Sequence, residues 1–372
     1  MSKLEELIQQ YCPDGVEYVK LGDIEDQGYI KLGRGNVISK QDMKDCPGDF
    51  PVYSSSSVGD GEIGRYGKYM FDDERISWSI DGGGKFFYRN NLRYSITNVS
   101  GWLKVLAPKV VSTKYLYYTL MNEWVKKVYD YTHKAHPSVI REEYIIPIPP
   151  LPVQEEIVRI LDAFAELQAE LQAELQKRLQ QYNYYRDKLL SFDGRTDVEW
   201  KKLGEISKVC RGVRVVKSQL SNEGYPVYQN CLTPMGYYDK TNCPAGTPFV
   251  ICGGAAGNVG YADVDWWAAD DCEYIIGNVG LTNRYIYHCL MAKKDYLLSQ
   301  VRKASIPRLS PSVIKDLEIP VPSLAEQQRI VDILDMFDSL TTDLTAGLPA
   351  EIEKRKLQYE YYRDKLLTFK RK

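Results

Sequence analysis

Several short patterns in this 372-residue sequence contain residue types used in catalysis, but none has the context that catalysis requires. Gly59, Gly61 and Gly64 match G-x-G-x-x-G, yet the following RYGKYMFDD is not an amphipathic helix, which indicates a cluster of turns. The single Pro-Pro pair lies in I-P-P-L, not in the (Asn/Asp)-Pro-Pro-(Tyr/Phe) loop of adenine methyltransferases. Acidic runs at 72–74 and 270–271 lack an acid-x-Lys arrangement and are interpreted as solvated loops. We therefore predict a chain that is not itself an enzyme.

Metal and disulfide chemistry are equally poorly supported. The eight cysteines include no C-x-x-C pair, and they are too sparse for a disulfide scaffold, so reduced thiols are expected. His133 and His136 form the one close histidine pair, without a Cys or acidic partner at zinc-binding spacing. No metal and no cofactor is predicted in this chain.

Composition narrows the class of protein further. A hydrophobic content of 44% with 26% charged residues is typical of a globular protein, and no apolar run approaches the roughly 18 residues of a membrane span. The charged start MSKLEELIQQ does not resemble a secretory signal, so we expect a cytoplasmic protein. A net charge of -2 excludes a strongly basic, indiscriminate nucleic-acid binder, so any contact with DNA must come from local patches.

The elements that position the side chains occur twice in the sequence. YYRDKLL at 184–190 recurs unchanged at 361–367, and IPIPPLPVQEEIVRILD at 146–162 aligns with IPVPSLAEQQRIVDILD at 319–335, at an offset of 173 residues. VEYVKLGDI from Val16 and VEWKKLGEI from Val198 extend the match, as do PVYSSS and PVYQNC. Each half therefore has the same order: a mixed globular region, a proline-rich exit and a helical segment.

The helical segments follow the prolines. Apolar residues recur every three or four positions from Ile157 to Leu189, which predicts one helix over about 152–191, roughly 60 Å long. Its single apolar stripe requires a partner, which the second copy supplies with a stripe from Ile330 to Leu344, so an intramolecular helix pair is expected. Gly347-Leu348-Pro349 predicts that the second arm stops and restarts. Three tandem AELQ units at 165–176 are either a plain helical spacer or a length setting, each unit adding about 6 Å and about 40° beyond one turn.

The predicted fold class is α+β, with two tandem-duplicated mixed α/β domains separated by long helices that pair as an antiparallel coiled coil. We divide the chain into an N-terminal segment (1–15), a first globular domain (16–150), a central long helix (151–195), a second globular domain (196–322) and a C-terminal helical region (323–372). The junction RDKLLSFDGRTDVEW has its counterpart split between KLLTFKRK and YCPDGVEY, so the two termini are expected to lie close together.

This order of parts, with the junction signature P-x-P-x-L-x-x-Q/E-x-x-I-V-x-x-L-D, resembles the specificity (S) subunit of Type I restriction-modification systems over essentially all 372 residues. The resemblance implies that each globular part is a target recognition domain for one half of a bipartite, asymmetric DNA site. It implies that the paired helices set the spacing and bind two methyltransferase (M) subunits, which two restriction (R) subunits can join. S-adenosylmethionine, and ATP with Mg²⁺ where a restriction subunit is present, would belong to those partners.

Candidate DNA-contacting residues follow from chemistry within this arrangement, because Arg, Lys, Asn and Gln match base edges in pairs and Ser serves phosphates. The first domain offers KLGRGN at 31–36, the serines at 54–57 and KAHPS at 134–138; the second offers RGVRVVK at 211–217, Gln229-Asn230 and RKASIPR at 302–308. The aligned glycine turns at 82–85 and 253–258 either approach phosphates or merely connect strands. The resulting DNA-binding candidates are Lys31, Arg34, Asn36, Ser54, Ser55, Lys85, Lys134, His136, Arg211, Arg214, Lys217, Gln229, Asn230, Asn258, Lys303 and Arg308.

The helical stripe supplies the candidates for partner binding. These are Ile157, Leu161, Leu167, Leu171, Leu175, Ile330, Leu334 and Phe337.

The balance of charged residues in the two globular domains predicts how tightly they would bind DNA. Lys and Arg number 18 against 17 Asp and Glu in residues 16–150, and 14 against 13 in 196–322. We therefore expect the isolated chain to bind DNA weakly, with steep loss in salt. Two alternatives remain open: a protein scaffold whose two domains bind ligands other than DNA, and a self-contained DNA methyltransferase or nuclease.

Overall fold

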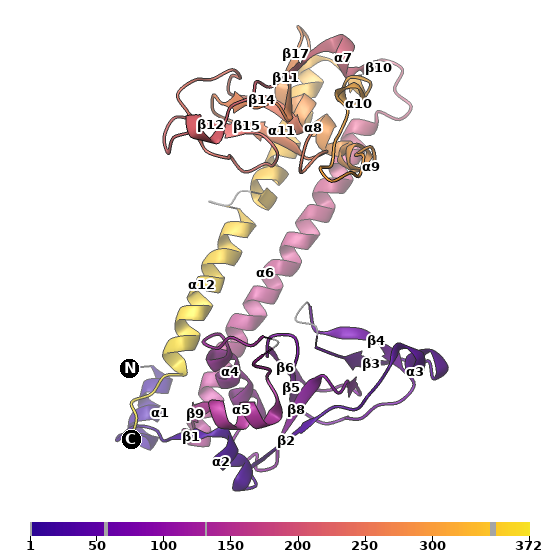
Figure 1. The fold of residues 1–372 in the computed structure, drawn as a ribbon. Helices are drawn as coiled ribbons and strands as arrows, with labels where there is room; N and C mark the ends of the chain where they lie inside the picture. The colour runs from indigo at the N-terminus through magenta and orange to yellow at the C-terminus, as the bar shows by residue number, and fades with distance from the viewer. Residues whose placement is uncertain (1, 56–58, 131, 343–346) are drawn as a thin grey trace. The chain divides into compact units, whose positions relative to one another are not determined.

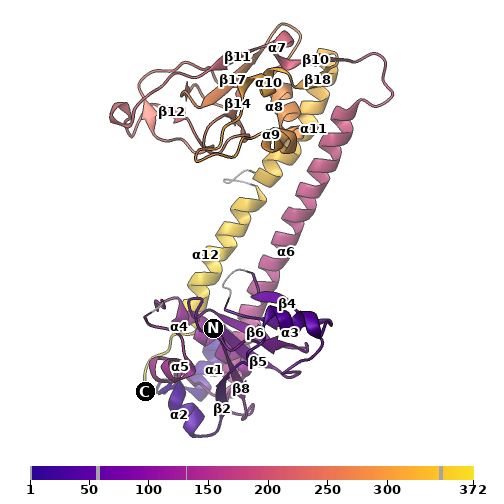
Figure 2. The same ribbon diagram turned by 45° about the vertical axis from the view of Figure 1, so that its right-hand side comes forward.

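The computed structural model describes residues 2–55, 59–130, 132–342 and 347–372. These residues form two compact units, each with helices and sheets (Figures 1 and 2). Unit 1 comprises residues 1–170 together with 353–372, and unit 2 comprises residues 171–352. Each unit is therefore assembled from both copies of the sequence repeat. Ser56 and Ser57, two of the serines in the first predicted DNA-contacting stretch, and Leu344 of the helical stripe lie outside the described residues.

The described residues of unit 1 form nine strands. They are β1 (Tyr18–Lys20), β2 (Ile30–Arg34), β3 (Phe50–Tyr53), β4 (Glu62–Tyr66), β5 (Arg75–Ser79), β6 (Phe86–Arg89), β7 (Ser95–Ile96), β8 (Ser100–Val105) and β9 (Ile145–Pro147). Its short helices are α1 (Lys3–Tyr11), α2 (Leu21–Asp26), α3 (Lys40–Asp45), α4 (Thr113–Trp124) and α5 (Pro137–Glu143). The strands form sheets ordered β2-β8-β5-β6, β4-β3-β7 and β1-β9. Glycines at 59 and 61 have positive φ and precede β4, so the G-x-G-x-x-G match is a turn and a strand.

Unit 2 repeats this topology strand for strand. Its strands are β10 (Glu199–Lys202), β11 (Ser207–Arg211), β12 (Tyr225–Tyr228), β13 (Tyr237–Tyr238), β14 (Thr247–Ile251), β15 (Val259–Ala262), β16 (Trp267–Ala268), β17 (Cys272–Gly277) and β18 (Glu318–Val321). Its short helices are α7 (Leu203–Ile206), α8 (Asn283–Ala292), α9 (Lys294–Ser299), α10 (Pro311–Lys315) and the 3-10 turn η1 (Lys217–Gln219). The sheets run β11-β17-β14-β15, β13-β12-β16 and β10-β18. The parallel pairing of β3 with β7 also recurs, as β12 with β16.

The long helices match the sequence prediction closely. Helix α6 (Leu151–Ser191) is 41 residues long and passes from unit 1 into unit 2, and it contains all three AELQ units. The second arm consists of α11 (Leu324–Thr342) and α12 (Leu348–Leu366), so the predicted stop and restart at Gly347-Leu348-Pro349 is confirmed. The mixed helix-and-sheet fold with two domains and a long helix is likewise confirmed.

Each unit joins the two arms by the same aromatic contact with the roles exchanged. In unit 1, Phe164 of α6 stacks on Tyr362 of α12 with ring centroids 5.5 Å apart and planes at 24°. In unit 2, Tyr185 of α6 stacks on Phe337 of α11 at 5.6 Å and 23°. Phe164 aligns with Phe337 in the repeat, and Tyr185 aligns with Tyr362. The helix pairing expected from the apolar stripe is therefore present within each unit.

A buried glutamine fixes the first turn of each arm to its globular domain. The Gln154 side chain is 0% exposed; its carbonyl accepts from the Ser112 N–H at 2.9 Å, and its amide donates to the carbonyls of Val110 and Pro149 at 2.9 and 2.7 Å. Gln327, also 0% exposed, accepts from the Thr282 N–H at 3.0 Å. Its amide donates to the carbonyls of Gly280 and Pro322 at 2.8 and 3.0 Å. The Q of the repeated junction signature is thus a structural anchor, because a buried amide needs all of its partners.

The aspartate that ends each copy of the junction signature, Asp162 or Asp335, receives hydrogen bonds from the globular domain of its unit. Asp162 accepts from Lys114 at 2.7 Å and from the Tyr118 hydroxyl at 2.6 Å. Asp335 of α11 pairs with Arg284 and His288, each at 2.7 Å. Burial opposes ionisation of Asp335, but the hydrogen bonds from His288 and Arg284 outweigh it and lower the pKa of Asp335.

The stripe predicted to bind a partner is in part core. Ile157 and Leu161 are 0% exposed and pack with Tyr115 and Tyr118 of α4. Ile330 and Leu334 are 0% exposed and belong to the main core of unit 2 with residues of α8. These four residues cannot contact another protein, so their assignment to partner binding was wrong. Leu167, Leu171, Leu175 and Phe337 are half-buried, and their role in partner binding stays a prediction.

The expected closeness of the termini is confirmed within unit 1. The Val16 N–H donates to the Lys370 carbonyl at 2.9 Å, and the Lys372 N–H donates to the Val16 carbonyl at 3.2 Å. Leu367 is buried beside Cys12 and Val16, as Leu190 is buried with Val198 in unit 2.

Candidate nucleic-acid interface

In unit 2, five predicted DNA-contacting residues gather around one polar surface cavity of about 430 Å³. Arg211, Arg214, Lys217, Gln229 and Arg308 line it, together with Asp270, Asp271, Val215, Val216 and Met235. These residues come from the end of β11, the loop into η1 and its first residue, the loop between β12 and β13, the turn before β17 and the loop before α10. Four cationic side chains against two carboxylates make the cavity locally positive, although the domain as a whole is nearly neutral.

Hydrogen bonds hold this cavity in shape. The Arg211 Nε donates to the Asp270 carbonyl at 3.0 Å, and the Gln229 amide lies 3.3 Å from the Asp270 carboxylate. Arg308 forms an ion pair with the Asp271 carboxylate. Glu273, which faces Arg211 across the β11–β17 ladder, is 4% exposed, and burial raises the pKa of its carboxyl. Arg214 and Lys217 are exposed at the rim.

Asp270 and Asp271 were missed at the sequence level, where they were interpreted as solvated loop residues. Asp271 is only 16% exposed at its side chain and pairs with Arg308, and both aspartates line the cavity. They do lie in a turn, as expected, but their place in the cavity was not predicted, because their partners lie about 40 residues away in the chain, where a local pattern cannot detect them. One signal was available: both residues directly precede β17, and the aligned residues in unit 1 precede β8.

In unit 1, residues of the stretch 31–36 and Ser54 lie at the position that corresponds to this cavity in the repeat. The Arg34 guanidinium donates twice to the Asn98 carbonyl, at 3.2 and 2.7 Å, as Arg211 does once to Asp270. Asn36 bridges to Thr97, whose hydroxyl lies 2.8 Å from that of Ser54. Lys31 is exposed on β2. Arg34, Asn36 and Ser54 therefore surround one segment, residues 96–98.

The backbone around these clusters is the same in both units. Thr97 N–H donates to the Tyr53 carbonyl at 2.9 Å, and the aligned Ala269 N–H donates to the Tyr228 carbonyl at 2.9 Å. Gly35 N–H bonds to the Ser100 carbonyl at 3.0 Å, and Gly212 N–H to that of Cys272 at 2.9 Å. On this shared frame the side chains differ: Asn98 corresponds to Asp270, and Ser54 to Gln229. One frame thus presents two different hydrogen-bonding patterns.

The glycine turns pack closely against the backbone of these loops. A Cβ at Gly82 would collide with the Ser55 carbonyl oxygen, and a Cβ at Gly254 would lie 2.9 Å from the Asn230 carbonyl oxygen. Asn258 donates to the Ala255 carbonyl at 2.9 Å within its own turn. The close approach of backbone explains the glycines, and DNA contact by Asn258 stays a prediction.

The remaining candidates lie near these loops. The Lys85 ammonium lies 5.2 Å from the Phe87 ring centroid, and Lys134 forms an ion pair with Asp81 at 2.9 Å. His136 occupies the N-cap position of α5 without a side-chain cap bond. Lys303 is exposed in the loop whose ends join where Arg302 N–H donates to the Arg308 carbonyl at 2.9 Å. DNA contact by each of these residues stays a prediction.

Other chemistry has little support in the described part of the chain. No group of three or more His, Cys, Asp or Glu residues in it could hold a metal ion. Every helix of the described segments is too short or too polar to cross a lipid bilayer.

Fold and site together define a protein with two equivalent modules, each presenting a different polar face on the same frame. The family model for the Type I restriction modification DNA specificity domain matches the chain twice, over residues 13–181 and 196–354. The chain therefore belongs to the family of Type I restriction-modification specificity subunits.

Relatives in sequence and structure agree with this assignment. The specificity subunit of a type I restriction enzyme from Escherichia coli is 36% identical over 291 residues, covering 69% of this chain and 70% of that protein. A Mycoplasma pneumoniae protein described as a type I specificity subunit is 30% identical over 364 residues, covering 94% of this chain and 97% of that protein. The crystal structure of a type I restriction-modification S subunit from M. genitalium shares the fold, with a TM-score of 0.68 at 18% identity and coverage of 95% and 96%.

Proposed function

We propose that this chain is the DNA-recognition subunit of a Type I restriction-modification complex and that each unit reads one half of a bipartite, asymmetric DNA site. The observation that carries the proposal is the repeated backbone frame with unlike polar side chains, Asn98 and Ser54 in unit 1 against Asp270 and Gln229 in unit 2. Two half-sites of different sequence require different donors and acceptors on equivalent positions. Membership of the specificity-subunit family supports the same conclusion.

The chain itself performs no catalysis in this proposal. Two methyltransferase subunits bind it and transfer the methyl group, and two restriction subunits join where the system includes them. S-adenosylmethionine, ATP and Mg²⁺ then bind to those subunits in the cytoplasm of the host cell. The nearly neutral charge of both domains supports a need for partners, because few phosphates can be neutralised by this chain alone.

The half-site assignment is tested by mapping modified adenines in the source genome. Deleting the gene should abolish one bipartite motif, and replacing residues 16–150 by the corresponding domain of another specificity subunit should change one half of that motif and leave the other unchanged. A motif that persists without the gene contradicts the proposed function. A swap that alters both halves contradicts the assignment of one half-site to each unit.

A further inference from the structure

Unit 1 and unit 2 contain equivalent grooves beside their stacked aromatic pairs. The unit 1 groove has a volume of about 500 Å³ and the unit 2 groove about 760 Å³. Seven lining positions correspond in the repeat: Ile160 with Ile333, Phe164 with Phe337, Tyr362 with Tyr185, Lys365 with Lys188, Leu366 with Leu189, Thr368 with Ser191 and Phe369 with Phe192. The sequence repeat therefore builds the same apolar floor twice.

The grooves differ in what covers them. In unit 1 the amphipathic helix α1 forms one wall through Ser2, Leu4, Glu5 and Ile8. Leu4 is 7% exposed, and Ile8 packs partly buried on the same core cluster. In unit 2 the aligned junction between Phe192 and Val198 contains no helix, and the wall consists of Asp193, Arg195, Glu326 and Arg329. The unit 2 groove thus lacks the helix that its counterpart has.

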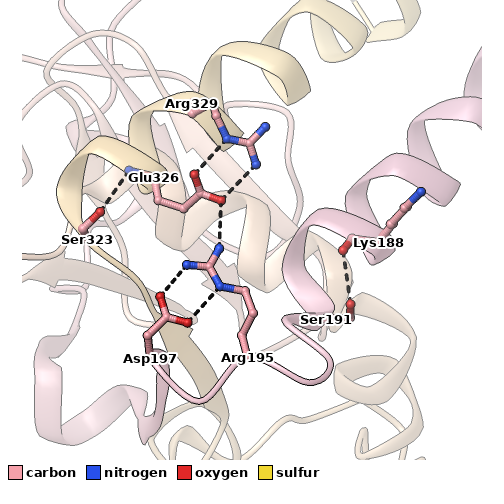
Figure 3. Close-up of polar contacts among 7 residues, drawn as sticks. All are labelled: Lys188, Ser191, Arg195, Asp197, Ser323, Glu326 and Arg329. Carbon is pink, nitrogen blue, oxygen red and sulfur yellow. Dashed lines mark hydrogen bonds and ion pairs between the residues drawn. The ribbon is translucent and has the colours of Figure 1, made fainter.

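Charge separates the two grooves further. Lys3 of α1 forms an ion pair with Glu156 at 2.8 Å, but the residue aligned with Glu156 in unit 2 is Arg329. The side chain of Arg329 is 52% exposed and already pairs with Glu326, which also contacts Arg195 at 3.4 Å (Figure 3). A lysine in the position of Lys3 would therefore meet a like charge in unit 2.

Lys188 is a further cation that lines the unit 2 groove. Its equivalent Lys365 lines the unit 1 groove together with Glu5 of α1. Lys188 extends away from the network of Arg195, Glu326 and Arg329 (Figure 3), and no carboxylate among the described residues forms an ion pair with it. The unit 2 groove is lined by three cations, Lys188, Arg195 and Arg329, and by two carboxylates, Asp193 and Glu326. A helix placed in it as α1 is in unit 1 would therefore meet an excess of positive charge, with Lys188 and Arg329 among the side chains that it faces.

We propose that the unit 2 groove binds an acidic amphipathic helix of a second protein in the place that α1 occupies in unit 1. Two apolar side chains four residues apart, like Leu4 and Ile8, would cover Ile333 and Phe337, and carboxylates would face Lys188 and Arg329. The identity of that second protein rests on the proposed function, under which it is the methyltransferase subunit. A second copy of this chain would supply Lys3 instead of an acid and fits less well.

The test measures fluorescence polarisation of labelled peptides on the full chain. The probes are residues 2–11 with the native sequence and with Lys3→Glu, both stapled between the exposed positions of Glu6 and Gln10, because an isolated helix of this length is marginal in water. The Lys3→Glu peptide should bind more tightly than the native one. Lys188→Glu/Arg329→Glu should weaken its binding roughly fivefold or more. The control Lys177→Glu/Lys356→Glu, with the same change in net charge, should not.

Each other result overturns the inference. Equal binding to the groove variant and the control would show that the groove charges are not contacted, and tighter binding of the native peptide would point to α1 of a second copy. No saturable binding by either peptide would exclude a helix site. Native mass spectrometry with a co-expressed methyltransferase subunit separates the two proposals. If that subunit fails to bind the wild-type chain, the proposed function fails; if it binds the groove variant as tightly as the wild type, the inference fails.

Discussion

Replacing Gln154 by leucine should selectively destabilise unit 1. Leucine has a similar volume, so the loss comes from the three hydrogen bonds that Gln154 makes with Ser112, Val110 and Pro149. At about 1 kcal/mol net for each bond, and more where a buried partner is left unsatisfied, the expected cost is about 3 to 4 kcal/mol. That is a large share of the roughly 5 to 15 kcal/mol that stabilises a typical domain.

Hydrogen exchange is the appropriate assay, because a chain of two units need not unfold in one step. In Gln154→Leu, core amides of α4 and the first turns of α6 should lose about 3 to 4 kcal/mol of protection, while those of α8 and β17 keep theirs. Gln327→Leu should show the reverse pattern, because Gln327 makes the equivalent bonds in unit 2. The control is Gln328→Leu, which removes an exposed side chain that donates to Asp332 and should cost less than about 0.5 kcal/mol. A loss below about 1 kcal/mol, or equal losses in both units, would refute the anchoring role.

Three further predictions concern DNA recognition and acid stability. Deleting one AELQ unit from 165–176 should shorten the undefined spacer of the methylated motif, because it removes about 6 Å and about 40° of helix; an unchanged motif would favour a plain spacer. In the assembled complex, Arg214→Ala should weaken binding to all DNA sequences alike and reduce the salt dependence of log K by about one ion. Asp270→Asn should instead change the base preference in one half-site only. Binding titrations at several salt concentrations distinguish these outcomes, and an unchanged base preference would show that Asp270 does not contact the bases. The pKa of Asp335 in the folded state lies below its ordinary value of 3.8, so the stability that Asp335 contributes is present above that value and is lost as pH falls through the folded pKa. Asp335→Asn should therefore reduce the loss of unit 2 stability at acid pH. An unchanged dependence of stability on acid pH would contradict the stabilising role of the ionised Asp335.

Repetition made the large-scale organisation predictable. The helix expected over about 152–191 occupies Leu151–Ser191, and the interruption expected at Gly347-Leu348-Pro349 separates α11 from α12. Both depend on local rules, namely three-and-four apolar spacing and the effects of glycine and proline on helices. The split counterpart of the 186–200 junction also indicated that the termini meet, as Val16 and Lys370 do.

Features that depend on contacts between segments far apart in the sequence were harder to predict from local patterns. An apolar stripe shows that a helix is covered on one side but not by what, so Ile157 and Ile330 were assigned to a partner although α4 and α8 cover them. The cavity of unit 2 joins residues from 211 to 308, and its carboxylates have no local signature. Gln154 shows the same limit, because its role depends on carbonyls at 110 and 149 that only the folded chain brings together.

The composition of unit 1 has a consequence for how the protein is made. Residues 353–372 pack into the unit that begins at the N-terminal side of the chain, where Leu367 and Tyr359 join the core of Leu4 and Val16. A ribosome synthesises that support only after the whole of unit 2 has been translated, at roughly 5 to 20 residues per second. Unit 1, most of which is translated before unit 2, is thus completed after it, and a premature stop codon near position 350 would damage unit 1 although it lies far downstream of residues 1–170.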